Sequence, residues 1–255
     1  MFCIMAHGWL RLLISLWNIH YTIVLSVNSA GCQDQQAMSD QFMFFADLLG
    51  TVIFAITGAV SGMKLRLDML GVIVFGCLVG VGGGIVRDTV IGATPVAVLQ
   101  NEIYLAACII TGLVVFFLFK RLENHQKVIL ICDAFGLGVF TALGVAKGNL
   151  YHLGPIGLAT CGVLSAVGGG ILRDVMARKI PAVLVNNFYA TASLIGGLAY
   201  IALLKMEKNG WLEISDFTCF IVTTLLVLII RLLAIRYNFH LPGAQETDKK
   251  NIGSN

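Results

Sequence analysis

Long apolar stretches dominate the chain after Met38, and short polar or charged connections separate them. A helix that crosses a bilayer needs about 20 mainly apolar residues, and seven stretches approach that length. They cover residues 43–63, 69–92, 102–119, 128–147, 153–177, 186–205 and 214–236. The pattern predicts an all-α integral membrane protein with seven transmembrane helices.

Residues 1–37 do not fit this pattern and leave three interpretations open. Arg11 precedes an apolar run, and small residues follow the run from Ser29 to Gly31, as in a signal-like leader. The segment could equally be an additional helix, or the native protein could begin at Met38. At the other end of the chain, residues 239–255 are polar and are expected to form a disordered cytoplasmic tail.

The chain contains an internal repeat with a shift of 86 residues. The shift superimposes the block Val81–Ile85 on Val167–Ile171, and Arg87-Asp88 on Arg173-Asp174, without a gap. It also matches Asp47 with Asp133, Gly50 with Gly136, Phe54 with Phe140, Gly58 with Gly144, Gly76 with Gly162, Pro95 with Pro181 and Asn101 with Asn187. Self-similarity of this kind predicts two repeats, 42–122 and 128–208, followed by a seventh helix at 212–238.

Each repeat holds three predicted helices. Because three is an odd number, the second copy enters the membrane from the opposite side. The two repeats are therefore inverted about an axis that lies in the membrane plane. In transporters built this way, interrupted helices at matching positions mark a solute site at the repeat interface, so we expect the functional site there.

Three consecutive glycines lie in the second helix of each repeat, Gly82–Gly84 and Gly168–Gly170. Each glycine weakens a helix by about 1 kcal/mol relative to alanine, so we expect a break whose exposed carbonyls line a pore or contact a substrate. Irregular backbone at membrane depth is tolerated where it faces protein or a water-filled cavity. The alternative is that the glycines only provide a close packing surface.

The charged pair that follows the glycines, Arg87-Asp88 and Arg173-Asp174, also indicates a site. A charge at the bilayer centre costs about 2.5–3.5 kcal/mol on insertion scales. Neighbours on a helix do not face each other, so Arg87 is expected to pair with Asp47, Asp133, Asp174 or a freed carbonyl. The alternative is that both arginines extend to the membrane interface.

Asp47 and Asp133 lie near the starts of the first and fourth predicted helices. Two interpretations remain open for them. They either line the pore with the arginines, or they stabilise the helix starts through the macrodipole.

Composition supports a membrane protein and argues against other classes. The chain is 58% hydrophobic and only 12% charged, whereas soluble domains are about 25% charged. The net charge of +3 is too small for a nucleic-acid-binding face. No Ser/His/Asp or HExxH arrangement occurs, so we predict no enzymatic activity, and the seven cysteines lack CxxC spacing, so no metal or cofactor is expected.

The distribution of basic residues predicts the orientation, because cytoplasmic loops carry an excess of Lys and Arg. The connections after the first, third and fifth helices, together with the C-terminal end, hold Lys64, Arg66, Lys120, Arg121, Lys127, Arg178, Lys179, Arg231, Arg236, Lys249 and Lys250. The connections after the fourth and sixth helices hold only Lys147, Lys205 and Lys208. The first helix is therefore expected to start outside the cell, and the C-terminus to lie in the cytoplasm.

The two blocks GGGIVRDTVIGATP and GGGILRDVMARKIP resemble those of bacterial membrane proteins with paired "glycine transporter" domains, which are related to the prokaryotic trimeric intracellular cation (TRIC) channels. The resemblance covers residues 42–236 and implies a 3+3+1 inverted-repeat fold, a homotrimer in the bacterial inner membrane, and a pore within each protomer. The pore-associated positions that it implies are Gly82, Gly83, Gly84, Arg87, Asp88, Gly168, Gly169, Gly170, Arg173 and Asp174. The family pattern does not require residues 1–37.

Three functions follow from these observations. The first is a potassium-type channel for monovalent cations, and the second is a secondary transporter for a small zwitterion such as glycine, with arginine on the carboxylate and aspartate on the amine. The third is a scaffold or intramembrane enzyme without transport. The expected partners are a small ion or solute and the membrane lipid, with no nucleic acid.

Overall fold

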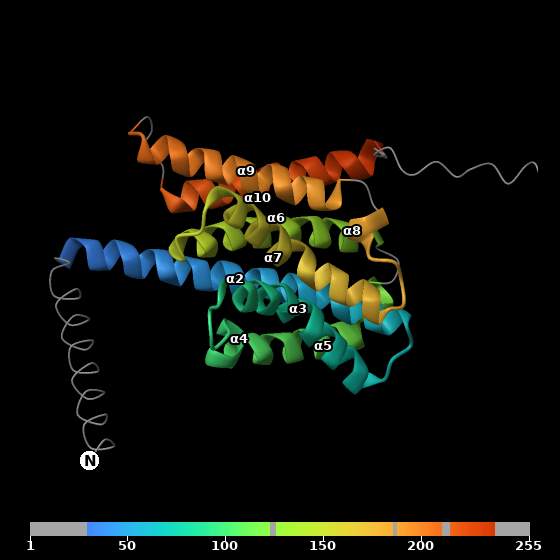
Figure 1. The fold of residues 1–255 in the computed structure, drawn as a ribbon. Coiled ribbons are helices and arrows are strands. Elements are labelled where there is room, and N and C mark those ends of the chain that lie inside the picture. The colour runs from blue at the N-terminus through green and yellow to red at the C-terminus, as the bar shows by residue number, and fades with distance from the viewer. Residues whose placement is uncertain (1–29, 123–125, 186–187, 211–214, 238–255) are drawn as a thin grey trace, which may run out of the picture. The chain divides into compact units, whose positions relative to one another are not determined.

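The computed structural model describes residues 30–122, 126–185, 188–210 and 215–237, and every regular element in these ranges is a helix (Figure 1). The chain divides into two compact units, Met1–Met43 and Phe44–Asn255, and the repeated motifs belong to the second. The long helices are α2 (Ala30–Lys64), α3 (Met69–Ile91), α5 (Ile103–Leu122), α6 (Gln126–Leu150), α7 (Pro155–Met176), α9 (Tyr189–Lys208) and α10 (Asp216–Tyr237). Two short helices, α4 (Ala97–Gln100) and α8 (Ala182–Val185), precede α5 and α9.

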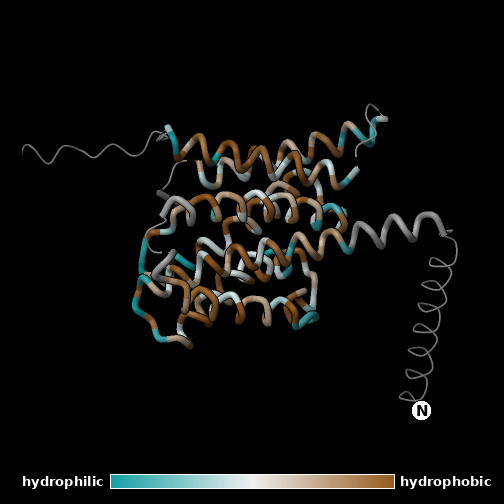
Figure 2. The backbone as a smooth tube through the Cα atoms, turned by 180° about the vertical axis from the view of Figure 1, so that it is seen from behind, coloured by the Kyte–Doolittle hydropathy of each residue, from teal (hydrophilic) through white to brown (hydrophobic). Residues whose placement is uncertain are grey.

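Among the described residues, six helices are long and apolar enough to cross a membrane, and the apolar part of α5, Ile103–Phe119, is shorter. These seven segments correspond to the seven predicted stretches and confirm the all-α membrane fold. Hydrophobic residues fill the helices, and hydrophilic residues gather mainly at the helix ends and connections (Figure 2). One boundary differs from the prediction, because α2 begins at Ala30 and not near residue 43.

The turns before and after α3 and α7 have the same backbone conformation at positions 86 residues apart. Arg66 and His152, which are 86 residues apart, both have positive φ angles of 58° and 54° in the turns before α3 and α7. Gly92 and Arg178, again 86 apart, have φ angles of 75° and 55° just after the same two helices. The duplication seen in the sequence therefore extends to the turn geometry that starts and ends the second helix of each repeat.

Reciprocal contacts relate the two repeats. A Cβ added at Gly50 of α2 would meet the ring of Phe140 on α6 at 3.1 Å, and one added at Gly136 of α6 would meet the ring of Phe54 on α2. The two phenylalanine rings themselves pack with their centroids 5.1 Å apart. Because each contact maps onto the other under the 86-residue shift, the repeats are related by a pseudo-two-fold arrangement.

The triple glycines lie where α3 crosses α7. A Cβ added at Gly169 would lie 2.6 Å from the Val79 carbonyl oxygen, and one at Gly83 would overlap the Ser165 carbonyl oxygen. Both helices run continuously through their glycines, so the expected helix break is wrong. The physical reason is tertiary: packing of one backbone directly on the other outweighs the low helix propensity of glycine.

Candidate functional site

The first charged cluster is built around Arg87, near the C-terminal end of α3, whose side chain is 1% exposed. Its Nε donates to Asp88 Oδ1 at 2.8 Å, and its Nη2 donates to Asp47 Oδ2 at 3.3 Å. The predicted partner Asp47 is therefore found, but the expectation that Arg87 would not pair with its neighbour Asp88 is wrong. The long arginine side chain bends so that its Nε reaches the shorter carboxylate beside it.

Asp88 connects this cluster to two further elements. Its Oδ1 also accepts a hydrogen bond from Lys147 Nζ of α6 at 2.7 Å, and its Oδ2 accepts from the backbone N–H of Ala97, the first residue of α4, at 3.0 Å. The Tyr104 hydroxyl of α5 donates to Asp47 Oδ2 at 3.4 Å. Residues from both repeats thus form one buried network in which every charge has an opposite partner.

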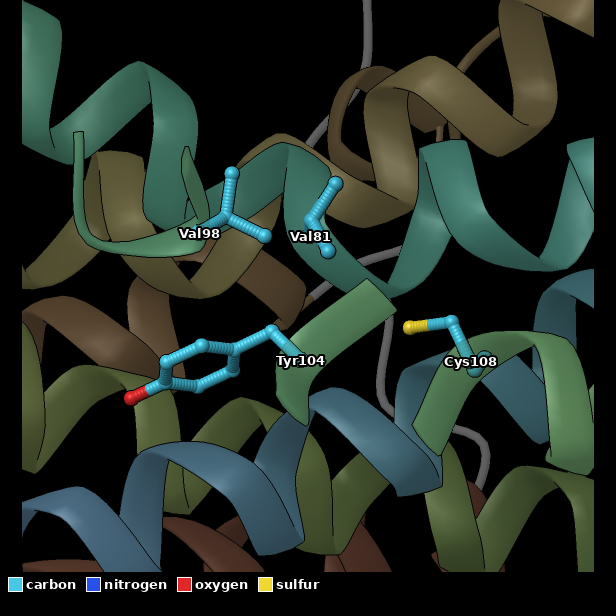
Figure 3. Close-up of a cluster of buried hydrophobic side chains, with 5 residues drawn as sticks. Val81, Val98, Tyr104 and Cys108 are labelled. Carbon is cyan, nitrogen blue, oxygen red and sulfur yellow. The ribbon is translucent and has the colours of Figure 1, made fainter. Parts of the chain in front are cut away.

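A small cavity opens beside this network, with room for about one water molecule. Its polar walls come from Asp47, Thr51, Arg87, Asp88 and Tyr104, and Gly84 contributes bare backbone. Val81 of α3 and Val98 of α4 line its apolar side. These valines belong to a buried hydrophobic cluster with Tyr104 and, one turn further along α5, Cys108 (Figure 3). The cavity therefore lies between the charged network and a packed apolar region.

The second cluster repeats this geometry around Arg173, near the C-terminal end of α7. Arg173 Nη1 donates to Asp133 Oδ1 at 2.7 Å, and its Nε donates to Asp174 Oδ1 at 3.0 Å. Asp174 Oδ2 accepts from the backbone N–H of Ala182, at the start of α8, at 2.7 Å. In both repeats the aspartate after the arginine therefore holds the arginine with one oxygen and the following short helix with the other.

The two clusters differ in the groups around them. The buried hydroxyl of Tyr189, at the start of α9, lies beside Asp133 and Arg173 but forms no well-aligned hydrogen bond with either among the described residues. The guanidinium of Arg231, on α10, lies 4.7 Å from the centre of the Tyr189 ring. Arg231 is 5% exposed, and its Nε is also unpartnered within the described part of the chain.

The structure brings together the predicted charged residues in two sets, Asp47 with Arg87 and Asp88, and Asp133 with Arg173 and Asp174. The predicted glycines fall into two groups. Gly82, Gly83, Gly168 and Gly169 lie at the α3–α7 crossing, whereas Gly84 and Gly170 lie beside Arg87 and Tyr189 respectively.

Sequence reasoning missed four members of these clusters: Lys147, Tyr104, Tyr189 and Arg231. Lys147 and Arg231 were assigned to loop or terminal charge, but they lie inside α6 and α10. A signal for both was available, because each is a lone cation within an apolar run, and such residues usually face a partner inside the protein. The two tyrosines carried no signal that separates them from ordinary interfacial aromatics.

The charged side chains of the two clusters are paired because they are buried. An ion removed from water loses several kcal/mol of hydration, and only opposite charges with good hydrogen-bond geometry offset that loss. Arg87 and Asp88, at 1% and 2% exposure, meet this requirement through two cations and two carboxylates. The arginine and aspartate of the second pair, Arg173 and Asp174, are 14% and 12% exposed and are therefore less deeply buried than Arg87 and Asp88.

Known proteins share both the sequence pattern and the fold. The sequence model of a family described as "Glycine transporter" matches residues 44–120 and 130–205, one match for each repeat. A UPF0126 membrane protein of Vibrio cholerae is 37% identical over 213 residues, which cover 83% of this chain and 87% of that protein. The UPF0126 inner membrane protein YadS of Escherichia coli K12 is 37% identical over 201 residues, 78% of this chain and 95% of its own length.

Solved TRIC channels have the same fold. A structure of a TRIC cation channel, 31% identical in sequence, superimposes with a TM-score of 0.72 over 80% of this chain and 98% of its own. The TRIC orthologue of Rhodobacter sphaeroides, 28% identical, also gives a TM-score of 0.72, over 78% and 99% of the two chains. The chain therefore belongs to the glycine-transporter family of multi-pass membrane proteins, which includes the UPF0126 proteins and shares its fold with the prokaryotic TRIC channels.

Proposed function

We propose that the chain conducts small monovalent cations, potassium in particular, through a pore within each protomer. The observation that carries this proposal is the pair of ion-paired carboxylate clusters, one in each repeat, inside helices that are otherwise apolar. Intramembrane charges of this kind generally mark an ion or substrate pathway. The similarity to solved TRIC cation channels supports the same conclusion.

The proposed path connects the two clusters and passes beside the α3–α7 crossing, where Gly82, Gly83, Gly168 and Gly169 are packed between the two helices. Gly84 and Gly170 supply backbone surface next to the clusters. Asp47, Asp133 and Asp174 supply oxygen ligands that replace water around the ion. Conduction requires sites that attract an ion but release it again. A carboxylate that is ion-paired with an arginine meets this requirement, because the arginine partly neutralises its charge and so lowers its affinity for a passing cation.

Assembly and location follow from the relatives. The R. sphaeroides orthologue is named a trimeric channel and YadS an inner membrane protein, so we infer a homotrimer in a bacterial inner membrane. With the basic loops in the cytoplasm, α10 ends inside the cell. The first cluster then lies in the outer half of the membrane and the second in the cytoplasmic half.

A zwitterion transporter is the second candidate, and one observation favours it. Each cluster presents an arginine beside two carboxylates, which matches the carboxylate and ammonium groups of an amino acid such as glycine. The family description names glycine as well. The two functions differ in what limits the flux, because a carrier saturates and couples to a gradient whereas a channel passes its ion down the electrochemical gradient.

Purified protein in liposomes tests the choice. We expect potassium currents in a planar bilayer and no saturable accumulation of labelled glycine in the same preparation. Asp133→Asn should reduce the current, whereas Asp216→Asn, the same chemical change at the exposed start of α10, should not. Gradient-coupled glycine uptake without potassium current would contradict the channel and support the carrier.

A further inference from the structure

The two clusters contain different numbers of directly bonded charges. In the first, the carboxylates of Asp47 and Asp88 are bonded to two cations, Arg87 and Lys147. In the second, Asp133 and Asp174 are bonded to Arg173 alone among the described residues. Two otherwise matching sites therefore differ by one unit of positive charge in contact with the carboxylates.

The pseudo-two-fold relation explains where the missing charge would lie. Lys147 of α6 corresponds to Ser61 of α2 under the 86-residue shift, and both residues lie three positions before the end of their helix. The pair Lys147–Asp88 therefore maps onto Ser61–Asp174. Ser61 cannot supply a charge, and its hydroxyl donates instead to the Thr57 carbonyl oxygen at 2.8 Å.

A buried oxygen lies beside the second cluster. The Tyr189 side chain is 2% exposed, and its hydroxyl lies beside Asp133 and Arg173 without a well-formed hydrogen bond to either of them within the described residues. In the first cluster Tyr104 is bonded to Asp47. A buried hydroxyl without a well-formed hydrogen bond is unfavourable, and a bound cation would use its oxygen as a ligand.

Arg231 does not take the place of Lys147. Its guanidinium stacks on the ring of Tyr189 at 4.7 Å and forms no ion pair with a carboxylate in the described residues. It is close enough to Asp133 to act on it electrostatically. A positive charge at that distance weakens the binding of another cation without replacing it.

We propose that the second cluster binds one small monovalent cation, at the position that corresponds to the Lys147 ammonium in the first cluster. The ligands are the carboxylate oxygens of Asp133 and Asp174 and the hydroxyl oxygen of Tyr189. Lys147 thus acts as a tethered cation that keeps the first cluster permanently neutral, and only the cytoplasmic half of the path holds an exchangeable ion. This assignment rests on the proposed conduction of monovalent cations.

Cation-dependent stability of the detergent-purified protein tests the assignment without measuring transport. Rubidium chloride replaces N-methyl-D-glucamine chloride at constant ionic strength, and the thermal unfolding midpoint is followed. We expect the midpoint of the parent to rise with rubidium and saturate as for one site. A midpoint that does not respond to rubidium would overturn the assignment and would mean that water alone occupies the position.

Two substitutions exchange the roles of the clusters. Ser61→Lys places a tethered ammonium in the second cluster and should abolish the rubidium response. Lys147→Met removes the tethered ammonium from the first cluster and should add a second rubidium-dependent rise. A Ser61→Lys protein that folds and keeps the full response, or a Lys147→Met protein whose response equals that of the parent, would each contradict the proposal.

Potassium flux measured on the same preparations distinguishes a failure of the proposed cation site from a failure of the proposed conduction. Rubidium-dependent stability without flux would leave the cation site in place and refute conduction. Flux in a parent protein whose stability ignores rubidium would leave conduction in place and refute this site.

Discussion

Lys147 Nζ lies 2.7 Å from Asp88 Oδ1, so a lysine of the second repeat completes the charged cluster of the first. The contact has no charged counterpart on the other side of the pseudo-two-fold axis, where Ser61 takes the corresponding position. The two otherwise similar clusters therefore differ in charge at this position. The consequences of that asymmetry for stability and for ion flux can be measured.

Replacing Lys147 with methionine should destabilise the protein in the absence of small cations. The substitution keeps most of the side-chain volume but leaves Asp88 with one cation instead of two. Loss of one partner of a buried pair costs about 3–5 kcal/mol, and because Lys147 is 21% exposed we expect about 1–2 kcal/mol. Thermal unfolding in N-methyl-D-glucamine buffer measures the effect, and Lys205→Met, at an exposed position near the end of α9, is the control. Equal midpoints for the two variants would show that the Lys147 pair contributes nothing.

Arg87→Ala should be among the most damaging single changes in the chain. It leaves Asp47 and Asp88 buried with only Lys147 to neutralise them, at a cost of about 3–5 kcal/mol. Arg87→Lys keeps the charge but loses the guanidinium fork that reaches both carboxylates, so its thermal midpoint should lie between those of the parent and Arg87→Ala. The double variant Arg87→Ala/Asp47→Asn should recover part of the loss, because it removes an unpaired charge. Failure of the second substitution to restore any stability would argue against the Arg87–Asp47 pair.

Gly83→Ala should separate α3 from α7. The added methyl group overlaps the Ser165 carbonyl oxygen, a backbone atom that cannot rotate away. Overpacking of this kind typically costs about 1–3 kcal/mol, and Gly169→Ala should have a similar effect because its new Cβ would lie 2.6 Å from the Val79 carbonyl oxygen. Gly154→Ala is the matched control, since a Cβ there meets nothing within 4 Å. A Gly83→Ala protein as stable as the control would mean that the helix crossing is looser than described.

Arg231→Gln should strengthen cation binding at the second cluster. The substitution removes a positive charge that acts on Asp133 across the Tyr189 ring. A change of about 1 kcal/mol, the size of the interaction between two unit charges 4 Å apart in bulk water, corresponds to about a fivefold lower half-saturating rubidium concentration. Because Arg231 is only 5% exposed, we expect a decrease of at least this size. Arg236→Gln, an exposed position at the end of the same helix, should leave the concentration unchanged. Weaker binding in Arg231→Gln would show that Arg231 supports the site instead of opposing it.

Much of the fold could be predicted from the sequence because characteristic residues occur in both repeats at the same spacing. The glycines at the α3–α7 crossing and the Arg-Asp pairs recur at the same spacing, and the apolar stretches have the length of a membrane span. The pairing of Arg87 with Asp47 was also accessible, because a buried arginine requires a carboxylate and few are present in the apolar stretches.

Other parts of the site could not be read from one sequence. The continuity of α3 through Gly82–Gly84 depends on the backbone of α7 that packs on it, and no local propensity reports that contact. The Arg87–Asp88 contact forms because the arginine side chain bends toward its neighbour. Helical spacing gives only the directions in which the two side chains leave the backbone, so it does not predict this contact. Lys147 and Arg231 are different, because each is a lone cation in an apolar run and so carries a signal, although hydropathy alone assigns them to the membrane surface. The membrane orientation, the trimer and the role of residues 1–37 remain predictions.

Potassium flux through liposomes that carry the Arg87→Ala/Arg173→Ala variant tests the central claim most directly. Both charged clusters lose their arginine in this protein, which should therefore be less stable than the parent. In preparations that size-exclusion chromatography and circular dichroism show to be folded, we predict that flux falls to the level of protein-free liposomes. A folded variant that conducts potassium as the parent does would show that the clusters only hold the helices together, and would contradict the account.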